Sequence, residues 1–131
     1  MSVESTQAVM QRYWGGGHSD TSTIAEDAVF TIMDTGQEHH GPEGIGRMLK
    51  QFYHGTFEAD VETYNTIISD GQAVVEGYVV GKHTGEFAGI PATGKDVRVP
   101  ICVIYDLQND KITKGRVYMA SGILFQQLGV R

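Results

Sequence analysis

Cysteine and basic residues are scarce in this chain. Cys102 is the only cysteine among 131 residues, so an intramolecular disulfide is impossible and no oxidising compartment is required. Lysine and arginine number 10 against 16 aspartate and glutamate residues, which gives a formal net charge of −6. A nucleic-acid-binding protein needs clustered basic residues to neutralise phosphates, and here these residues are scattered. We therefore expect no nucleic-acid partner, and we expect the cytoplasm as the location.

Long apolar runs are also missing. No stretch approaches the roughly 20 residues that a helix needs to span a bilayer. The first residues have neither the basic start nor the apolar segment of a signal peptide. We expect no membrane association. A chain of this length fits one domain over residues 1–131, with about two-thirds of its surface buried on folding.

Helical spacing is clearest near the N-terminus, where four residues recur on one side: Val3, Met10, Tyr13 and Trp14. They predict a first helix that ends at the glycines of residues 15–17. A cap at Ser19 or Asp20 predicts a short second helix that runs to about Glu26. Pro42 favours the first turn of a third helix, whose apolar side carries Ile45, Met48, Leu49 and Phe52.

The remaining chain has the composition of β-structure. A strand at residues 28–33 ends at Asp34, and a short return strand passes through His39 and His40. Turn residues separate four long strands expected near 57–68, 72–86, 96–107 and 111–120. Helices followed by a meander predict an α+β arrangement with helices on one side of a single sheet. The dispersed glycines indicate that this sheet is strongly bent.

The strand near 96–107 carries apolar residues on both faces. One face consists of Val97, Val99, Ile101, Val103, Tyr105 and Leu107. The other face includes Pro100, Cys102 and Ile104. Helices on one side leave the second face open, so a second subunit is the simplest cover, and we predict a homodimer. The strand near 57–68 differs, because its alternate residues Glu58, Asp60 and Glu62 indicate a solvent-exposed face.

Residues 81–129 carry a family pattern. Residues 81–95 read Gly-Lys-His-Thr-Gly-Glu-Phe-Ala-Gly-Ile-Pro-Ala-Thr-Gly-Lys, a β-rich run follows, and Gln127, Leu128 and Gly129 come near the end. This stretch resembles the SnoaL-like polyketide cyclases of the nuclear transport factor 2-like superfamily. The resemblance implies an α+β fold in which a cone-shaped, curved, mixed or antiparallel sheet and covering helices enclose a pocket for a small hydrophobic molecule.

The same resemblance concerns the last strand. In the cyclases this strand typically carries Glu, an aromatic residue and Asp, and the corresponding positions here are Lys114, Arg116 and Ala120. Strand alternation puts Arg116, Tyr118 and Ala120 on one face, which the resemblance turns toward the pocket. Ala120 thus replaces the family's acid/base aspartate. The expected lining of the pocket is Tyr13, Trp14, Asp34, Cys102, Ile104, Arg116, Tyr118 and Ala120.

A shorter similarity is to ketosteroid isomerase, a relative in the same superfamily. It rests on Val-Met-Gln-Arg-Tyr at residues 9–13 and Val-Pro-Ile-Cys at residues 99–102. This similarity implies that Tyr13 donates to an oxyanion, that Asp34 lies close to the position of the general base, and that Cys102 replaces a protonated aspartate. A thiol is a weak hydrogen-bond donor, so Cys102 predicts weaker oxyanion stabilisation.

Each candidate residue also has a structural interpretation. Asp34 begins an Asp-Thr-Gly turn, in which the Asp side chain commonly bonds the backbone ahead. Tyr13 is typical of a buried helix face. Cys102 is typical of a small buried hydrophobic residue, and no motif supplies the base that would make it a nucleophile. Arg116 is suited to a salt bridge with a carboxylate such as Asp106 or Asp34.

The histidines do not predict a metal site. His39 and His40 adjoin Glu38, but neighbouring strand residues point to opposite faces and do not readily share one ion. His83 lies in the 81–95 segment and is a candidate for the pocket rim, with an exposed strand histidine as the alternative. We expect no metal and no other cofactor.

These observations favour a cofactor-independent cyclase or isomerase that moves a proton on a hydrophobic, carbonyl-bearing molecule, polyketide-like or steroid-like. Asp34 is the predicted base, and Tyr13 and Arg116 are predicted to stabilise the oxyanion. The competing hypothesis is a non-catalytic binding protein for a small hydrophobic ligand, which Ala120 favours. A third hypothesis, an epoxide hydrolase of the limonene type, needs an Asp-Arg-Asp set and loses one expected member at Ala120.

Overall fold

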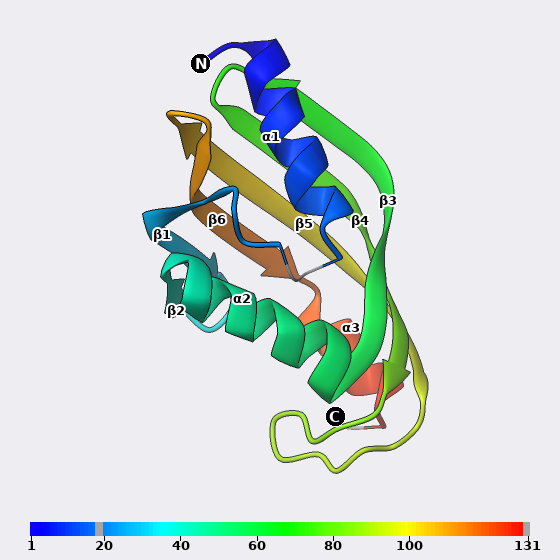
Figure 1. The fold of residues 1–131 in the computed structure, drawn as a ribbon. Coiled ribbons are helices and arrows are strands. Elements are labelled where there is room, and N and C mark those ends of the chain that lie inside the picture. The colour runs from blue at the N-terminus through cyan, green and yellow to red at the C-terminus, as the bar shows by residue number, and fades with distance from the viewer. Residues whose placement is uncertain (18–19, 130–131) are drawn as a thin grey trace.

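The computed structural model describes residues 1–17 and 20–129 and contains one six-stranded sheet with helices packed on it (Figure 1). In chain order the elements are α1 (Val3–Gly15), β1 (Ile24–Ile32), β2 (Gln37–His40), α2 (Gly41–Gln51), a π-helical turn η1 (Phe52–Thr56), β3 (Phe57–Ser69), β4 (Gln72–His83), β5 (Asp96–Gln108), β6 (Lys111–Met119) and α3 (Ser121–Gln127). The strand order is β2-β1-β6-β5-β4-β3. The β1–β6 pair is parallel and the other four pairs are antiparallel.

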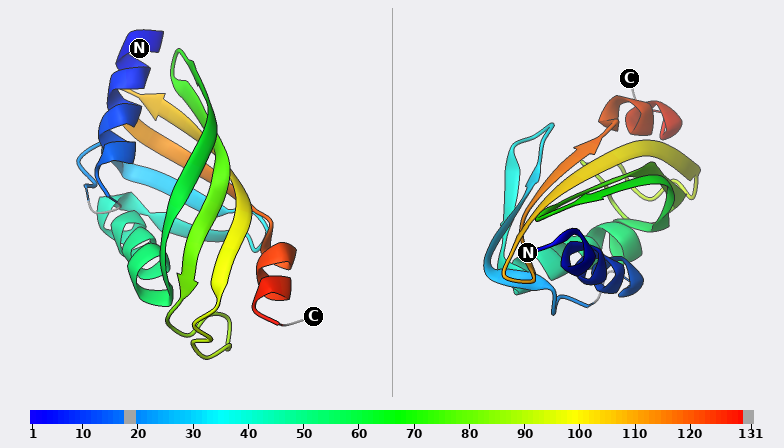
Figure 2. Two further views of the ribbon diagram at one scale, coloured as in Figure 1. Left: turned by 90° about the vertical axis from the view of Figure 1, so that its right-hand side faces the viewer. Right: turned by 90° about the horizontal axis from the view of Figure 1, so that it is seen from above.

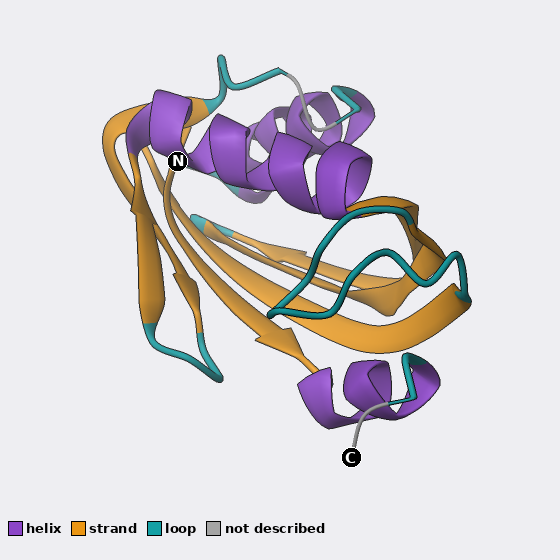
Figure 3. Cartoon of the chain, turned by 90° about the horizontal axis from the view of Figure 1, so that it is seen from below, coloured by secondary structure: helices purple, strands orange, loops and turns teal. Residues whose placement is uncertain are grey.

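Helices α1 and α2 lie on the same side of the sheet, which we call the inner face (Figure 3). We call the opposite side the outer face. The long strands β3, β4 and β5 bend as they cross the molecule, so the sheet curves around the two helices (Figure 2). The predicted α+β fold with a curved sheet and covering helices is therefore confirmed.

The predicted first and third helices are present. Ser2 and Ser5 form a reciprocal capping box at the start of α1, and Gly16 caps its end. Pro42 stands in the first turn of α2, where the missing N–H is not needed. Helix α2 then widens into η1, which leads directly into β3.

The predicted second helix is wrong in its described part, residues 20–26; Ser19 lies outside the described residues. The carboxylate of Asp20 accepts hydrogen bonds from the backbone N–H and the hydroxyl of Ser22, at 2.9 and 2.6 Å. These bonds form a turn instead of a helix cap. The carbonyl of Thr23 then accepts from the backbone N–H of Ile112, which draws the segment into the sheet at β1.

Two glycines of β4 permit the sharp bend at β3. A Cβ atom on Gly77 would lie 2.3 Å from the carbonyl oxygen of Glu62, and one on Gly81 would lie 2.3 Å from that of Glu58. Real Cβ atoms do not approach this closely, so only glycine lets the β3 backbone come this near to β4. The prediction that glycines serve a strongly bent sheet is borne out at these two positions.

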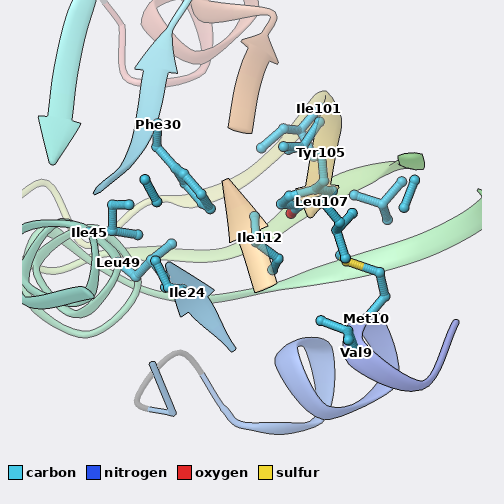
Figure 4. Close-up of a cluster of buried hydrophobic side chains, with 14 of the residues drawn as sticks. Val9, Met10, Ile24, Phe30, Ile45, Leu49, Ile101, Tyr105, Leu107 and Ile112 are labelled. Atoms are coloured by element: carbon cyan, nitrogen blue, oxygen red, sulfur yellow. The ribbon is translucent and has the colours of Figure 1, made fainter. Parts of the chain in front are cut away.

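The main hydrophobic core lies between the inner face and the two helices (Figure 4). Met10 from α1, Ile45 from α2 and Phe30 from β1 are all essentially inaccessible to solvent, at 0%, 0% and 1% exposure. The face of β5 with Ile101, Val103, Tyr105 and Leu107 belongs to this core, as its alternation predicts.

A second, smaller core forms where β5 extends beyond β6. Phe57, Val97, Val99, Leu124 and Leu128 make up this cluster. Helix α3 docks there through Gln127, whose side-chain amide accepts from the N–H of Arg98 and donates to its carbonyl, each at 2.8 Å. Gln127 thus satisfies backbone groups that β6 does not reach. None of the helices in the described part of the chain is long and apolar enough to cross a membrane.

Candidate functional site

A hollow of about 480 Å³ opens on the outer face, beside the tip of the β1–β2 hairpin. Its walls come from the end of β6, the middle of β4 and β5, and the residue before α3. The side chains that give it chemical character are Met33, Asp34, Tyr64, Glu76, Cys102 and Tyr118. The hollow therefore combines two carboxylates and two phenols with an apolar floor.

A second hollow, of about 490 Å³, lies near the other end of the same face, over Glu58, Lys82 and Asp96. Lys82 and Asp96 form an ion pair at 3.1 Å there, and Glu58 meets the ring Nδ1 of His54 at 3.3 Å. These charged groups are already paired with neighbouring side chains. We therefore take the hollow at Asp34 as the candidate site.

Asp34 reaches this hollow from the hairpin that follows β1. The hydroxyl of Ser121, at the start of α3, donates to Oδ2 of Asp34. The turn itself is held by its neighbours, because the N–H of Gly36 donates to the carbonyl of Ile32 at 2.8 Å and Thr35 accepts from the N–H of Gln37 at 3.2 Å. The carboxylate of Asp34 therefore bonds across the fold, and Thr35 makes the local side-chain bond that the turn interpretation assigned to Asp34.

Cys102 and Glu76 lie side by side on paired strands. Partial burial raises the pKa of the Cys102 thiol, and the nearby Glu76 carboxylate raises it further. The thiol is thus kept protonated and is a poor nucleophile, but it is only partly buried and borders the hollow, which differs from the buried residue of the structural interpretation. Glu76 accepts a hydrogen bond from the side-chain amide of Asn65 at 3.3 Å, which fixes it at the edge of the hollow.

Arg116 is engaged by Asp106. Its two terminal nitrogens donate to the two carboxylate oxygens of Asp106, at 2.8 and 3.2 Å. These hydrogen bonds lower the pKa of Asp106, although its partial burial opposes the shift. The salt-bridge interpretation of Arg116 is confirmed, with Asp106 as its partner.

Tyr13 and Trp14 lie on the inner face, within an aromatic cluster. The ring centre of Tyr13 is 5.6 Å from that of Tyr105 and 6.3 Å from that of Phe30, and that of Trp14 is 6.2 Å from Tyr105. Burial raises the pKa of Tyr13 well above its usual value, and burial raises that of Tyr105 to about 12. Both phenols are therefore neutral hydrogen-bond donors. The indole N–H of Trp14 lies near the Tyr105 hydroxyl but makes no well-aligned hydrogen bond within the described chain.

Comparison with known proteins identifies the family to which this chain belongs. The family model described as SnoaL-like polyketide cyclase matches residues 7–128. The chain belongs to the SnoaL-like polyketide cyclase family. No match was found among curated protein sequences.

Solved structures agree in fold with this member of the SnoaL-like family. A SnoaL-like protein from Jannaschia sp. CCS1 has a TM-score of 0.84 at 16% identity, with 98% of this chain and 94% of that chain covered. TsrD from Streptomyces laurentii has a TM-score of 0.80 at 18% identity, over 98% and 97% of the two chains. A ketosteroid isomerase-like fold from Catenulispora acidiphila DSM 44928, in complex with trimethylamine, has a TM-score of 0.75 at 15% identity, over 96% and 95%.

The predicted site of this SnoaL-like chain is divided by the sheet. Asp34, Cys102, Tyr118 and Ala120 all border the hollow on the outer side. Tyr13 and Trp14 lie beyond the sheet on the inner face. The structure therefore does not bring Tyr13, Asp34 and Arg116 to one point, and the prediction of a single internal pocket for all of them is wrong.

Cross-strand register explains this correction. Directly paired residues point to the same side, and Arg116 pairs with Ile104 while Tyr118 pairs with Cys102. Tyr105, next to Ile104, is in the inner core, so these four side chains belong to the outer face. Their shared face was predicted correctly, but its assignment to the enclosed side was wrong. Ile104 does not border the hollow.

Ala120 lies just after β6, and its N–H donates to the carbonyl of Pro100 at 3.0 Å. The hydroxyl of its neighbour Ser121 bonds to Asp34, so a carboxylate from the β1–β2 hairpin lies close to Ala120, where the sequence resemblance implies an aspartate. Asp34 therefore lies at the candidate site as predicted, but its predicted partners Tyr13 and Arg116 do not lie there with it.

His83 differs from both interpretations, because it is completely buried. The backbone N–H of Thr93 donates to its Nδ1 at 3.2 Å, and the Thr93 hydroxyl lies 2.9 Å from the same atom. The ring also packs on Phe57, with centres 5.3 Å apart. We conclude that His83 anchors the connection between β4 and β5.

Sequence reasoning did not include Met33, Tyr64 and Glu76, which border the hollow, or Ser121, which bonds to Asp34. Tyr64 sits where the pairing of β3 with β4 shifts between Thr63 and Asn65, so simple alternation does not place it. Ser121 is 87 positions from Asp34 in the chain, and no local pattern links them. No group of three or more His, Cys, Asp or Glu residues suited to a metal ion occurs within residues 1–17 and 20–129.

Proposed function

We propose that this SnoaL-like chain transfers a proton on a small hydrophobic carbonyl compound, polyketide-like or steroid-like, bound in the hollow beside Asp34. The observation that carries the proposal is the Asp34 carboxylate in a hollow of about 480 Å³, hydrogen-bonded to Ser121 and accompanied by Tyr118. Family membership supports a cyclase or isomerase reaction. The chemistry needs no cofactor.

In this mechanism the Asp34 carboxylate removes a proton from the carbon next to the carbonyl. The electron pair of that C–H bond forms an enolate, which either takes the proton back from Asp34 at another carbon or attacks a second carbonyl to close a ring. The alkoxide formed by ring closure then takes the proton from Asp34, which restores the carboxylate. A hydrogen-bond donor must face the oxygen that becomes negative, and we assign this part to the hydroxyl of Tyr118, which borders the hollow, while the hydroxyl of Ser121 donates to Asp34 and orients it. Tyr13 has no part in this proposal because the sheet separates it from Asp34, and neither has Arg116 because Asp106 holds it.

Apolar walls suit such a substrate. Met33, Pro100 and Met119 border the hollow and offer contact area to hydrocarbon rings or chains. A protonated thiol at Cys102 adds a small, weakly polar surface. A chain with one cysteine cannot form an intramolecular disulfide and needs no oxidising compartment, which supports the cytoplasm as the site of action.

Deuterium exchange tests the proposal without knowledge of the natural substrate. The protein is incubated in heavy water with a panel of cyclic and linear β-diketones and β-keto esters, and NMR follows the loss of α-protons. We expect Asp34→Asn to lower the catalysed exchange by roughly 100-fold or more, because general-base catalysis typically contributes that much. Asp110→Asn is the matched control, since Asp110 lies in the β5–β6 turn with φ 59°, which asparagine tolerates.

A binding protein is the second candidate, and it is favoured by Ala120, which stands where the resemblance to the cyclases implies an acid/base aspartate. A carrier would bind members of the same panel in the hollow, with quenching of tyrosine fluorescence from Tyr64 and Tyr118, but would not speed exchange. Asp34→Asn would then change affinity alone. Exchange no faster than in the Asp34→Asn variant, together with saturable binding, rejects the enzyme and supports the carrier.

A further inference from the structure

The charged side chains that border the hollow at Asp34 are all of one sign. They are the carboxylates of Asp34 and Glu76, and no described lysine, arginine or histidine borders the hollow with them. Within residues 1–17 and 20–129 neither carboxylate forms an ion pair. Ser121 donates to Asp34, and the side-chain amide of Asn65 donates to Glu76 at 3.3 Å, but both of these donors are neutral. The described chain therefore leaves the negative charge of the hollow without a counter-charge.

Two arginines of the outer face lie near the hollow but serve other carboxylates. Arg116 precedes Tyr118 by two positions on β6 and donates to both oxygens of Asp106, at 2.8 and 3.2 Å. Arg98 on β5 donates to Glu62 at 3.0 Å. Because each arginine already has a carboxylate partner, a positive charge that balances the hollow has to be brought by a ligand.

Two open tyrosine rings border the hollow beside these carboxylates. Tyr64 and Tyr118 are 60% and 44% exposed. Loss of hydration and the adjacent Glu76 carboxylate raise the pKa of Tyr64, so this phenol stays neutral. The face of a neutral aromatic ring attracts cations. A neighbouring ring already does so, because the guanidinium carbon of Arg98 lies 4.0 Å from the centre of Tyr78, which is 5.6 Å from that of Tyr64.

From these observations we propose that the ligand of the hollow carries an alkylammonium group in addition to its carbonyl, and that Glu76, Tyr64 and Tyr118 bind this group. We call these three residues the ammonium site. The proposal rests on the proposed function, because it names the class of molecule on which Asp34 acts. Glu76 supplies the counter-charge, and the two rings supply apolar contact with a negative face, which is the combination that alkylammonium groups favour.

The charge of the ligand decides whether Glu76 gains or loses on binding. A neutral hydrocarbon group pressed against this carboxylate removes water from it without supplying a partner, which costs free energy. An alkylammonium group removes the same water but supplies an opposite charge at that place. A ligand carboxylate or sulfonate would instead meet the like charges of Glu76 and Asp34. We therefore expect the hollow to favour a cation over a neutral ligand, and a neutral ligand over an anion.

Strand register separates the ammonium site from the base. Glu76 pairs with Cys102, and Cys102 pairs with Tyr118, so the backbones of Glu76 and Tyr118 are about 10 Å apart at the usual spacing of strands. Asp34 lies beyond Tyr118, on the hairpin that follows β1, and β1 is the next strand after β6. The ammonium group and the carbon that loses its proton therefore lie at different ends of the ligand. The positive charge of the ligand also favours the enolate that forms near Tyr118.

Two ketones of equal shape test the proposal. In para-trimethylammonioacetophenone a nitrogen cation replaces the central carbon of the tert-butyl group of para-tert-butylacetophenone, and isothermal titration calorimetry measures the binding of each to the full chain. We expect the cation to bind at least about tenfold more tightly than the neutral ketone. The anion para-acetylbenzenesulfonate should bind more weakly than either. Equal affinity for the cation and the neutral ketone, or no binding of the cation at millimolar concentration, would overturn the proposal.

Variants test whether the ammonium site causes this preference. Glu76→Gln removes the counter-charge and keeps the shape, so the affinities for the cation and the neutral ketone should come within about threefold of each other. Glu86→Gln is the matched control, because it removes one negative charge from the exposed connection between β4 and β5. Tyr64→Leu should weaken binding of the cation by roughly fivefold, whereas Tyr64→Phe keeps the ring and should retain the affinity. Circular dichroism verifies that each variant is folded. A preference that persists in Glu76→Gln, or that falls equally in Glu86→Gln, rejects the ammonium site.

Binding and α-proton exchange together separate this inference from the proposed function. A preference for the cation that Glu76→Gln removes, with no catalysed exchange on any ketone, supports the ammonium site and rejects the enzyme. Exchange that depends on Asp34, with equal affinity for the cationic and neutral ketones, supports the enzyme and rejects the ammonium site. Exchange that depends on Asp34, together with tighter binding of the cation that Glu76→Gln abolishes, supports both.

Discussion

The inner and outer faces of the sheet show how one set of strands serves two purposes. The inner face packs Phe30, Ile112 and the β5 row against α1 and α2, and its polar atoms are few and buried. The outer face keeps Tyr64 and Tyr118 half open around a hollow and holds most of its charges in pairs. Packing therefore governs the inner face, whereas the two hollows described above lie on the outer face.

Large-to-small substitutions should separate the faces most strongly. Phe30→Ala removes a ring that is 1% exposed, and we expect the free energy of unfolding to fall by about 3–5 kcal/mol. Tyr64→Ala removes a ring that is 60% exposed and should cost under about 1 kcal/mol in the monomer. Urea unfolding at low protein concentration measures both values. Similar losses for the two variants would contradict the distinction between a packed and an open face.

The bend of the sheet around the two helices depends on Gly81. Its Cβ in Gly81→Ala would press on the carbonyl of Glu58 and on Ala59, so we expect a loss of roughly 1–3 kcal/mol in unfolding free energy. Gly44→Ala is the control, since no atom lies within 4 Å of its added Cβ and alanine favours a helix. Thermal unfolding compares them. A neutral Gly81→Ala would show that the close approach of β3 is not needed for the curved sheet.

Hydroxyl removal should lower the free energy of unfolding only on the inner face. Tyr13→Phe removes a hydrogen-bond partner of the buried Tyr105, and we expect a cost of about 1 kcal/mol at pH 7. The raised pKa of Tyr13 means that its stabilising contribution is present below about pH 10 and is lost as the pH rises further. Tyr13→Phe should therefore lose less stability between pH 9 and 11 than the wild type.

Tyr118→Phe on the outer face serves as its counterpart, because Tyr118 is 44% exposed. Its unfolding free energy should match that of the wild type within about 0.5 kcal/mol at pH 7. Chemical denaturation across the pH range measures both variants. An equal cost for the two hydroxyls would mean that the aromatic cluster of the inner face contributes no special hydrogen bonding.

The smallest expected effect concerns the Arg116–Asp106 pair. Arg116 lowers the pKa of Asp106, so the pair stabilises the fold above about pH 4 and this contribution is lost as the pH falls through the lowered value. Both side chains are about one-third exposed, at 28% and 32%, so solvent limits the effect to roughly 0.3–1 kcal/mol. In Arg116→Gln we expect a shallower loss of stability between pH 5 and 2. An unchanged acid slope would show that the pair is neutral for stability.

Local patterns in the chain account for several features of the fold. The helix at the N-terminus, the proline-started helix and the four long strands follow from side-chain periodicity and turn residues, which are local properties. The alternation in β5 correctly separated Tyr105 from Ile104. The short helix expected to end near Glu26 is absent, because Asp20 forms a turn with Ser22 and because the carbonyl of Thr23 accepts a hydrogen bond from β6.

The amino-acid sequence by itself determined the elements, the curvature that glycine permits, and the family, because these depend on local conformational preference and on motifs within residues 81–129. Only the tertiary structure decided that Arg116 and Tyr118 face away from α1 and that Asp34 meets Ser121. Alternation fixes which residues share a face, but the packing of the helices determines which face is enclosed. A contact between residues 87 positions apart depends on how the whole sheet curves, and no local pattern encodes it.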